Sequence, residues 1–392
     1  MRWAAPEVSA SVLQSKLSAA RGWMVPLLCA SLLAGCSLFS KPKRVPDPLP
    51  VPSGSARVDP AWNVALGAAS GVGFAPAIVG DAVWAAAQNG TIAVFDLDTG
   101  RERWKILAGK PLSAGVGTDG TTGVVVSRDG ALLAFDADGR AIWSVSLGGE
   151  VITPPAVADG VVLLRTSDNR VLAFDAATGK RRWTYQRQNP PLVLRNSGGI
   201  AMVPGVGFVG MPGGRIAALS LAGGAPRWDV PLATPRGANE LERVTDVVGT
   251  PLVIGRELCA VTYQGRIGCL DLVSGAPVWS REFSSAVGFD VDNSGLVSPD
   301  ADDTVHAFDR RGAPVWQQKG YAGRRLSAPL IVGRLVVLGD YQGNLLWLSR
   351  EDGTLAGVTR TDGTAVVASA AAGGRVVVTQ TSGGALYAFR VE

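Results

Sequence analysis

The chain repeats one short pattern of apolar and turn-forming positions eight times. In each copy a turn residue is followed, five positions later, by a large apolar residue, and aliphatic or β-branched runs lie on both sides of the turn. The apolar residues are 40, 39, 45, 51, 38, 40 and 41 positions apart. Short strands recurring at a period near forty predict an all-β fold, an eight-bladed β-propeller. The pairs are Gly90/Phe95, Gly130/Phe135, Asn169/Phe174, Gly214/Leu219, Gly265/Leu270, Asp303/Phe308, Gly343/Leu348 and Gly384/Phe389.

Each copy contains two turns. The first is a pair such as Asn89-Gly90, and it predicts a two-residue hairpin of type I′ with positive φ at both central residues. The second follows the apolar residue, as in the run 175–179 (Asp-Ala-Ala-Thr-Gly). Its aspartate can accept hydrogen bonds from nearby backbone N–H groups, and its glycine supplies a left-handed position. Each copy is therefore interpreted as a four-stranded antiparallel blade.

A tryptophan follows the second turn in six copies, and we expect it on the fourth strand, packed between neighbouring blades. Gly357 takes its place in the seventh copy, and the eighth ends at Glu392 without room for a fourth strand. The segment 62–67 (Trp-Asn-Val-Ala-Leu-Gly) resembles 143–148, so the N-terminal strand is expected to complete the eighth blade and close the ring, which removes free sheet edges. The six tryptophans are Trp104, Trp143, Trp183, Trp228, Trp279 and Trp316.

The N-terminal residues predict a secreted, lipid-anchored protein. Basic residues precede an apolar stretch at 23–33, which is too short for a membrane span and indicates a signal peptide over residues 1–35. The run 33–36 (Leu-Ala-Gly-Cys) resembles the bacterial lipobox, in which the cysteine becomes the lipidated first residue of the mature protein. The resemblance implies lipidation of Cys36 with acyl chains such as palmitate. An ordinary secretory signal with a stray cysteine is the alternative.

Because Ser37 rather than aspartate follows the cysteine, the lipobox resemblance implies the outer membrane. Residues 36–57, which contain five prolines, are interpreted as an extended tether, and residues 58–392 as the propeller. Residues 1–35 carry three basic residues and one acidic residue, so their removal lowers the formal net charge from +4 to about +2. A charge this small does not predict nucleic-acid binding.

No catalytic, metal or cofactor site is predicted. The single histidine, His306, lies at an ordinary strand position of the repeat. Neither this histidine nor the cysteines have metal-binding spacing. The repeated turn aspartates are dispersed round the ring rather than paired for acid–base chemistry. Cys259 and Cys269 flank the turn at 264–265 on adjacent strands, so a disulfide is expected in an oxidising periplasm, with two buried thiols as the alternative.

The repeat Ala-Phe-Asp-x-x-Thr-Gly-x-x-x-Trp resembles the pyrroloquinoline-quinone-like propeller repeat over nearly all of residues 58–392. Two branches share it. Quinoprotein dehydrogenases are much longer, place adjacent cysteines over the cofactor and bind calcium, whereas Cys259 and Cys269 are ten positions apart. With its lipobox, tether and bare ring, the chain is more similar to the BamB family, propeller lipoproteins of the outer-membrane β-barrel assembly machinery. A quinoprotein or small-ligand-binding propeller is the alternative.

Two intervals, of 45 and 51 residues, break the period and indicate a partner surface. The extra residues lie near 186–199 and 233–246, in connections from a fourth strand to the next blade, and therefore on one face of adjacent blades. The first contains Leu192 and Leu194, which are costly to expose without a partner unless they pack into the ring.

BamB proteins contact the periplasmic domains of BamA through a Leu-x-Leu-Arg segment and a nearby acidic segment. The resemblance places the first at Leu192, Leu194 and Arg195 and the second at Asp246, with Val248 where a second acidic residue is usual. It implies a non-enzymatic scaffold that binds BamA, faces the periplasm from the outer membrane and aids insertion of outer-membrane proteins. Unfolded clients could also bind the propeller directly.

Overall fold

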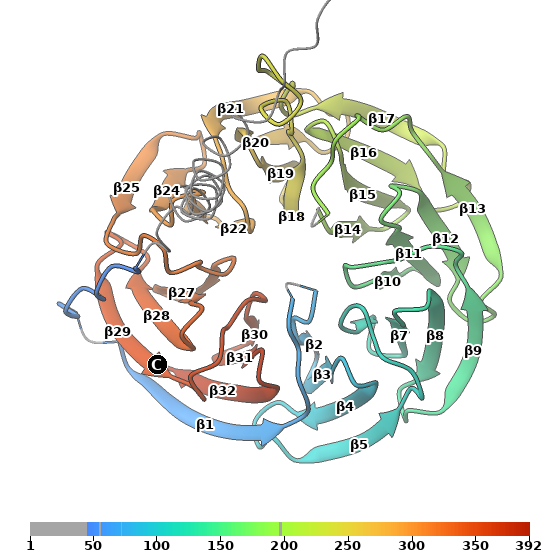
Figure 1. The fold of residues 1–392 in the computed structure, drawn as a ribbon, viewed down its shortest axis with the longest axis horizontal. Coiled ribbons are helices and arrows are strands. Elements are labelled where there is room, and N and C mark those ends of the chain that lie inside the picture. The colour runs from blue at the N-terminus through green and yellow to red at the C-terminus, as the bar shows by residue number, and fades with distance from the viewer. Residues whose placement is uncertain (1–44, 55, 72, 196–197) are drawn as a thin grey trace, which may run out of the picture. The chain divides into compact units, whose positions relative to one another are not determined.

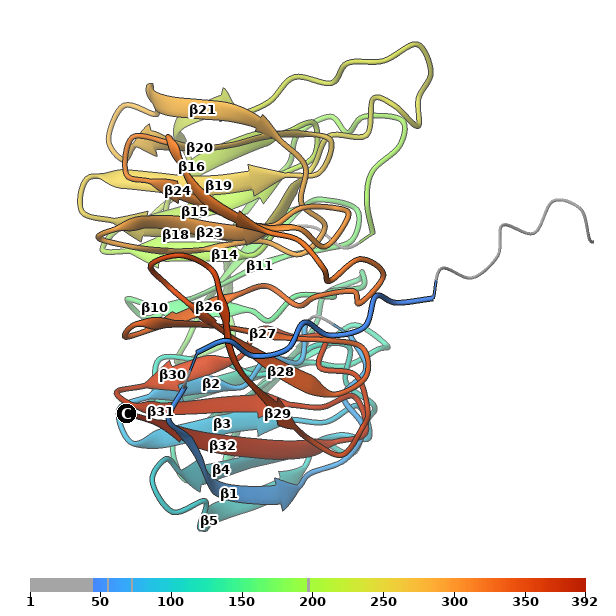
Figure 2. The same cartoon turned by 90° about the vertical axis from the view of Figure 1, so that its left-hand side faces the viewer.

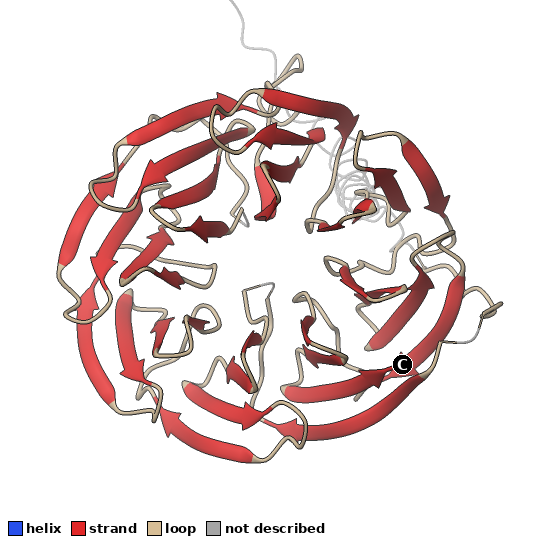
Figure 3. Ribbon diagram, turned by 180° about the vertical axis from the view of Figure 1, so that it is seen from behind, coloured by secondary structure: helices blue, strands red, loops and turns tan. Residues whose placement is uncertain are grey.

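The computed structural model describes residues 45–392 except 55, 72, 196 and 197. Eight separate four-stranded antiparallel sheets form a ring around a central channel, which confirms the predicted propeller (Figure 1). All regular structure in this part of the chain is strand (Figure 3). Among the residues described, no helix is long and apolar enough to cross a membrane. The predicted signal peptide and Cys36 lie outside the described residues.

Each of blades 1 to 4 is built from four consecutive strands. Blade 1 comprises β2 (Ala77–Val79), β3 (Ala82–Ala86), β4 (Thr91–Asp96) and β5 (Glu102–Leu107). Blade 2 comprises β6 (Gly117–Thr118), β7 (Thr122–Val126), β8 (Ala131–Asp136) and β9 (Ala141–Ser146). Blade 3 comprises β10 (Ala156–Ala158), β11 (Val161–Arg165), β12 (Val171–Asp175) and β13 (Arg181–Tyr185). Blade 4 comprises β14 (Ile200–Val203), β15 (Val206–Met211), β16 (Arg215–Ser220) and β17 (Pro226–Pro231).

Blades 5 to 7 follow the same order. Blade 5 comprises β18 (Val247–Ile254), β19 (Glu257–Thr262), β20 (Gly265–Asp271) and β21 (Pro277–Phe283). Blade 6 comprises β22 (Asp290–Asp292), β23 (Gly295–Pro299), β24 (Val305–Asp309) and β25 (Pro314–Gln318). Blade 7 comprises β26 (Leu330–Val332), β27 (Leu335–Gly339), β28 (Asn344–Ser349) and β29 (Leu355–Arg360).

Blade 8 joins the two ends of the described chain. It comprises β30 (Ala371–Gly373), β31 (Val376–Gln380), β32 (Ala385–Val391) and the N-terminal β1 (Val58–Ala65). Strand β1 pairs antiparallel with β32, and Trp62 lies opposite Ala388. The predicted ring closure by the N-terminal strand is therefore confirmed (Figure 1).

The hairpins between second and third strands differ from the predicted type I′ turns. In seven of the eight pairs only one residue has positive φ; Gly213-Gly214 is the exception. In blade 1 the Ala87 N–H donates to the Thr91 carbonyl, which leaves a three-residue loop that ends in left-handed Gly90. Such loops combine an ordinary type I turn with one left-handed residue. The prediction of two positive φ angles is therefore wrong in most blades.

The fourth-strand tryptophans pack between blades, as the sequence predicts. Six of them donate their indole N–H to a backbone carbonyl of the next blade, at 2.7 to 3.3 Å. Each ring also covers the turn glycine of that blade: a Cβ on Gly179 would lie 2.6 Å from Cδ2 of Trp143. These glycines have φ between 68° and 82°, so the position excludes a side chain by both conformation and space. They are Gly100, Gly139, Gly179, Gly224, Gly275, Gly312 and Gly353.

The aspartate of the second turn makes stability depend on pH. Asp175 Oδ1 accepts hydrogen bonds from the Thr178 N–H at 3.0 Å and the Thr178 hydroxyl at 2.8 Å. Hydrogen bonds from Arg182 and then Thr178 lower the pKa of Asp175 from 3.8 to about 2. The ionised carboxylate therefore stabilises the fold fully above pH 3.8, and this contribution is lost as the pH falls toward 2.

We expect the urea midpoint of the wild-type protein to fall between pH 4 and pH 2, since several such turns titrate together. Asp175→Asn should be less stable than wild type at pH 6, and the difference should shrink toward pH 2. A difference that is equal at both pH values would contradict the assigned role of the carboxylate.

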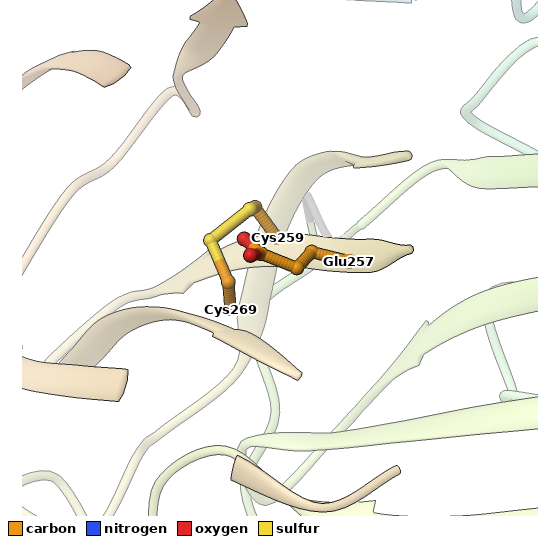
Figure 4. Close-up of side chains that lie close together, drawn as sticks. All are labelled: Glu257, Cys259 and Cys269. Carbon is orange, nitrogen blue, oxygen red and sulfur yellow. A yellow bond between two sulfur atoms is a disulfide. The ribbon is translucent and has the colours of Figure 1, made fainter. Parts of the chain in front are cut away.

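Cys259 and Cys269 lie opposite each other on β19 and β20 and are joined by a disulfide (Figure 4). The Glu257 carboxylate lies beside the sulfurs, and the three residues could in principle hold a metal ion. The two sulfurs are instead bonded to each other, and Glu257 accepts a hydrogen bond from Arg310 at 2.7 Å. This trio is therefore a structural element of blade 5.

Thiol titration of the unfolded, unreduced mature protein should find neither Cys259 nor Cys269 free. The loop between them is short and the hairpin already restrains it, so we expect the disulfide to add at most about 3 kcal/mol of stability. Comparison with a Cys259→Ser/Cys269→Ser variant measures that contribution. Two reactive thiols per unfolded chain would show that the bridge is absent.

Candidate partner-binding surface

The two longest connections of the ring lie on one face. Loop 1 (186–199) joins β13 to β14, and loop 2 (232–246) joins β17 to β18, so the loops follow the fourth strands of blades 3 and 4. Figure 2 shows both extending from the same side of the ring. Loop 1 is tied to the start of blade 5, because the N–H groups of Gly198 and Gly199 donate to carbonyls of β18 at 2.7 and 2.8 Å.

Asp246 joins the two loops from inside. Its side chain is only 1% exposed. Oδ2 accepts the N–H of Leu194 in loop 1 at 2.6 Å, and Oδ1 accepts the N–H of Gly213 in the blade 4 hairpin at 3.0 Å. Asp246 therefore does not lie on the surface as a direct contact residue would. Its carboxylate holds the Leu-x-Leu-Arg segment in place.

A buried arginine accompanies this carboxylate. Arg165, at the end of β11, is 4% exposed and donates to the Gly210 carbonyl of β15. Burial lowers the pKa of Arg165 to about 10, against the opposing effect of the Asp246 charge. Burial also disfavours the charged form of Asp246 and so raises its pKa, whereas the hydrogen bonds from Leu194 and Gly213 lower it. Opposite charges with satisfied hydrogen bonds make burial of both groups tolerable.

The Leu-x-Leu-Arg segment divides into an exposed part and an anchored part. Leu192 is 39% exposed, whereas Leu194 is half-buried and packs against the apolar cluster of blades 5 and 6. The Arg195 side chain is 77% exposed and pairs with Glu150 at 2.7 Å. Leu192 and Arg195 are thus accessible, and Leu194 fits the alternative that a leucine packs into the ring.

Loop 2 presents an apolar residue that the sequence interpretation did not single out. Leu241 is 73% exposed. The turn that carries it is braced internally: Glu242 accepts hydrogen bonds from the Ala238 N–H at 2.7 Å and the Asn239 amide at 2.9 Å. The Glu242 N–H in turn donates to Asn239 Oδ1 at 3.0 Å. This hydrogen-bonded turn therefore holds an exposed leucine on the face from which both loops extend (Figure 2).

We define the loop surface as Leu192 and Arg195 of loop 1 with Leu241 of loop 2. Asp246 and Leu194 lie beneath it and position loop 1. The structure therefore brings together the four residues predicted from the sequence, but gives two of them a supporting role. Leu241 could have been noticed as a lone leucine within the otherwise polar run 239–243.

The central channel offers a cavity of about 640 Å³, lined mainly by small apolar side chains and backbone. Of the described residues that line it, only Asp290 is charged, and its carboxylate accepts the N–H groups of Ile331 and Val291 at 2.7 and 2.8 Å. A calcium site needs several oxygen ligands from more than one acidic or amide group. The channel residues described do not fit that pattern.

His306 lies away from both the loop surface and the channel lining. Its Nε2 is 2.9 Å from Asp300 Oδ2, and its ring stacks on Phe308 and meets the edge of Phe283. These contacts belong to the packing of blade 6.

Comparison with known proteins identifies the family. The family model described as outer membrane protein assembly factor BamB matches residues 88–318 and 288–392. A protein of that name from Bordetella pertussis is 41% identical over 335 residues, covering 84% of this chain and 87% of the relative. The Burkholderia pseudomallei protein of the same name is 38% identical over 332 residues, covering 83% and 87%.

Solved structures agree on the fold. The crystal structure of BamB from Moraxella catarrhalis superposes with a TM-score of 0.78 at 24% identity, covering 85% of this chain and 99% of that chain. The quinohemoprotein alcohol dehydrogenase from Comamonas testosteroni has a TM-score of 0.67 at 16% identity, covering 85% and 76%. Both structural likenesses show the propeller fold alone. The Bordetella and Burkholderia relatives, which are more similar in sequence, distinguish the BamB branch from the quinoprotein branch. The chain belongs to the family of outer membrane protein assembly factor BamB.

Proposed function

We propose that the protein is a non-catalytic scaffold lipoprotein of the outer-membrane β-barrel assembly machinery. Its loop surface would bind the periplasmic domains of BamA, and Cys36 would anchor it to the outer membrane on the periplasmic side. By holding these domains near the insertion site, it would aid insertion of outer-membrane proteins. The observation that carries the proposal is the pair of braced loops, which hold exposed Leu192, Arg195 and Leu241 on one face.

The chemistry of the loop surface suits a protein partner. Arginine is one of the residues enriched in interface hot spots, and the exposed Leu192 and Leu241 add apolar area on the same face as Arg195. The ion pair of Arg195 with Glu150 is solvent-exposed, so it contributes only about 0–1 kcal/mol. The guanidinium can therefore exchange Glu150 for a carboxylate of the partner at little cost.

Affinity capture of the full-length protein from detergent-solubilised outer membranes, followed by mass spectrometry, tests the assignment. BamA should be enriched with the wild-type protein and depleted when the loop surface is altered. Absence of BamA at wild-type expression would contradict the proposal. Absorbance and calcium content of the purified protein test the quinoprotein alternative, which one bound quinone per chain would establish.

A further inference from the structure

The segment that precedes β1 is docked on the ring. Residues 46–54 and 56, which the sequence assigns to the tether, run along blade 7 beside β29 (Figures 1 and 2). The N–H groups of Ser53 and Ala56 donate to the carbonyls of Leu355 and Ala356, at 3.0 and 3.1 Å. These bonds lie at the beginning of β29, the outer strand of blade 7.

A buried arginine binds the other end of this segment. Arg324 donates through Nε to the Asp47 carbonyl at 3.1 Å, and through Nη1 to the Asp340 carboxylate at 2.7 Å. The Arg324 side chain is 5% exposed and that of Asp340 is 0% exposed. The Asp47 N–H also donates to the Ala322 carbonyl at 3.0 Å. Nη1 also donates to Gln342 Oε1 at 3.2 Å, so Asp340 and Gln342 fix the planar guanidinium with its Nε–H directed at the Asp47 carbonyl.

Apolar packing supports the same contact. Leu49 packs against the core cluster of blades 6 and 7, which includes Tyr321 and Leu346. Val51, two residues later, is 87% exposed. The segment therefore packs against the ring at Leu49 and leaves Val51 in solvent.

The docked segment also accounts for the missing tryptophan. Of the eight fourth strands, only β29 has glycine at the tryptophan position, Gly357. A Cβ on Gly357 would lie 3.4 Å from the Ala56 Cβ, so Ala56 of the docked segment lies directly beside the position that carries tryptophan in the other fourth strands. A departure from the repeat in this blade alone indicates that the sequence is adapted to the docked chain.

We propose that residues 46–56 are a clamp that fixes where the membrane anchor leaves the propeller. Arg324 lies in the β25–β26 connection, a fourth-to-first-strand connection like loops 1 and 2, so the start of the clamp lies on the face that carries the loop surface (Figure 2). Nine residues, 37–45, separate Cys36 from the clamp and reach at most about 35 Å at 3.3–3.6 Å per residue. Given the proposed lipidation, the clamp directs the loop surface toward the membrane.

Hydrogen exchange of the full-length lipoprotein in detergent tests the clamp without any partner. The peptide covering 46–56 should exchange more slowly than an unstructured chain in the wild-type protein. Leu49→Ser should accelerate its exchange by at least about 10-fold, since a packed leucine side chain is lost. Val51→Ser is the matched control and should change exchange by less than about twofold. Wild-type exchange at the unstructured rate, or equal effects of both substitutions, would refute the clamp.

Fluorescence quenching tests the orientation separately. A fluorophore is attached to Leu241→Cys on the loop face or to Val273→Cys in the β20–β21 turn of the opposite face, and the lipoprotein is reconstituted into liposomes with a headgroup quencher. Quenching should be stronger at 241 than at 273, and the difference should vanish when 46–52 is replaced by a Gly-Ser sequence of equal length. Equal quenching in the wild-type protein would overturn the orientation. Failure of the lipoprotein to associate with liposomes would contradict the lipid anchor. The hydrogen-exchange experiment would then still test the clamp, because it does not depend on liposomes.

Discussion

Trp62→Ala is expected to destabilise the propeller by about 3 kcal/mol, the lower end of the range for buried tryptophan truncations, because Trp62 is only partly buried. Trp62 connects the two ends of the ring. Its indole N–H donates to the Leu97 carbonyl of blade 1 at 2.8 Å, and its ring covers Gly100 of the same blade. It also packs against Phe95, with ring centroids 6.3 Å apart. The substitution therefore leaves a cavity at the junction that closes the ring.

Urea denaturation followed by fluorescence and circular dichroism measures this loss. Asn63→Ala is the matched control, because Asn63 lies next to Trp62 on β1 with its side chain exposed. The urea midpoint of Trp62→Phe should lie between those of Trp62→Ala and Asn63→Ala. Phenylalanine keeps an aromatic ring over Gly100 but loses the hydrogen bond to Leu97. A midpoint for Trp62→Ala no lower than that of Asn63→Ala would mean that β1 does not close the ring in solution.

The blades were predictable because each depends on local and periodic signals. In six copies the second-turn glycine lies four positions before the tryptophan of its own blade. This glycine must be left-handed and must also lie under the tryptophan ring of the preceding blade. The hairpin type was not predictable from pairs such as Asn89-Gly90. A glycine at the second position satisfies a type I′ turn and also a type I turn that ends in a left-handed residue. Only the pairing of Ala87 with Thr91 distinguishes them.

The candidate site was less predictable because its supporting contacts are distant in sequence. Asp246 accepts N–H groups from Leu194 and Gly213, which lie 52 and 33 positions away. No local pattern reveals such partners, and the resemblance to BamB proteins places Asp246 in the partner contact itself. The composition of 46–56 likewise indicates an extended chain but not a docked one. Gly357 was the visible signal, and its meaning depends on a contact with Ala56.

The second large effect concerns partner binding. A Leu192→Ser/Arg195→Ala/Leu241→Ser variant should bind the BamA periplasmic domains more weakly by about 2 kcal/mol or more, roughly 30-fold in Kd. Its melting temperature should stay near wild type, because exposed substitutions usually change stability by only about 0.5 kcal/mol. The matched control is Val273→Ser/Val315→Ser/Arg101→Ala, which alters two exposed valines and an exposed arginine away from the loops. Wild-type affinity of the folded loop-surface variant would refute the site but not the fold.

Asp246→Ala separates positioning from contact. The substitution leaves the N–H groups of Leu194 and Gly213 without their acceptor, and each buried unsatisfied group costs about 1–3 kcal/mol. It also removes the charge that offsets the burial of Arg165. We therefore expect weaker BamA binding together with a lower melting temperature and faster hydrogen exchange in loop 1, unlike the loop-surface variant. Weaker binding with unchanged stability and exchange would instead show that the Asp246 carboxylate itself contacts the partner.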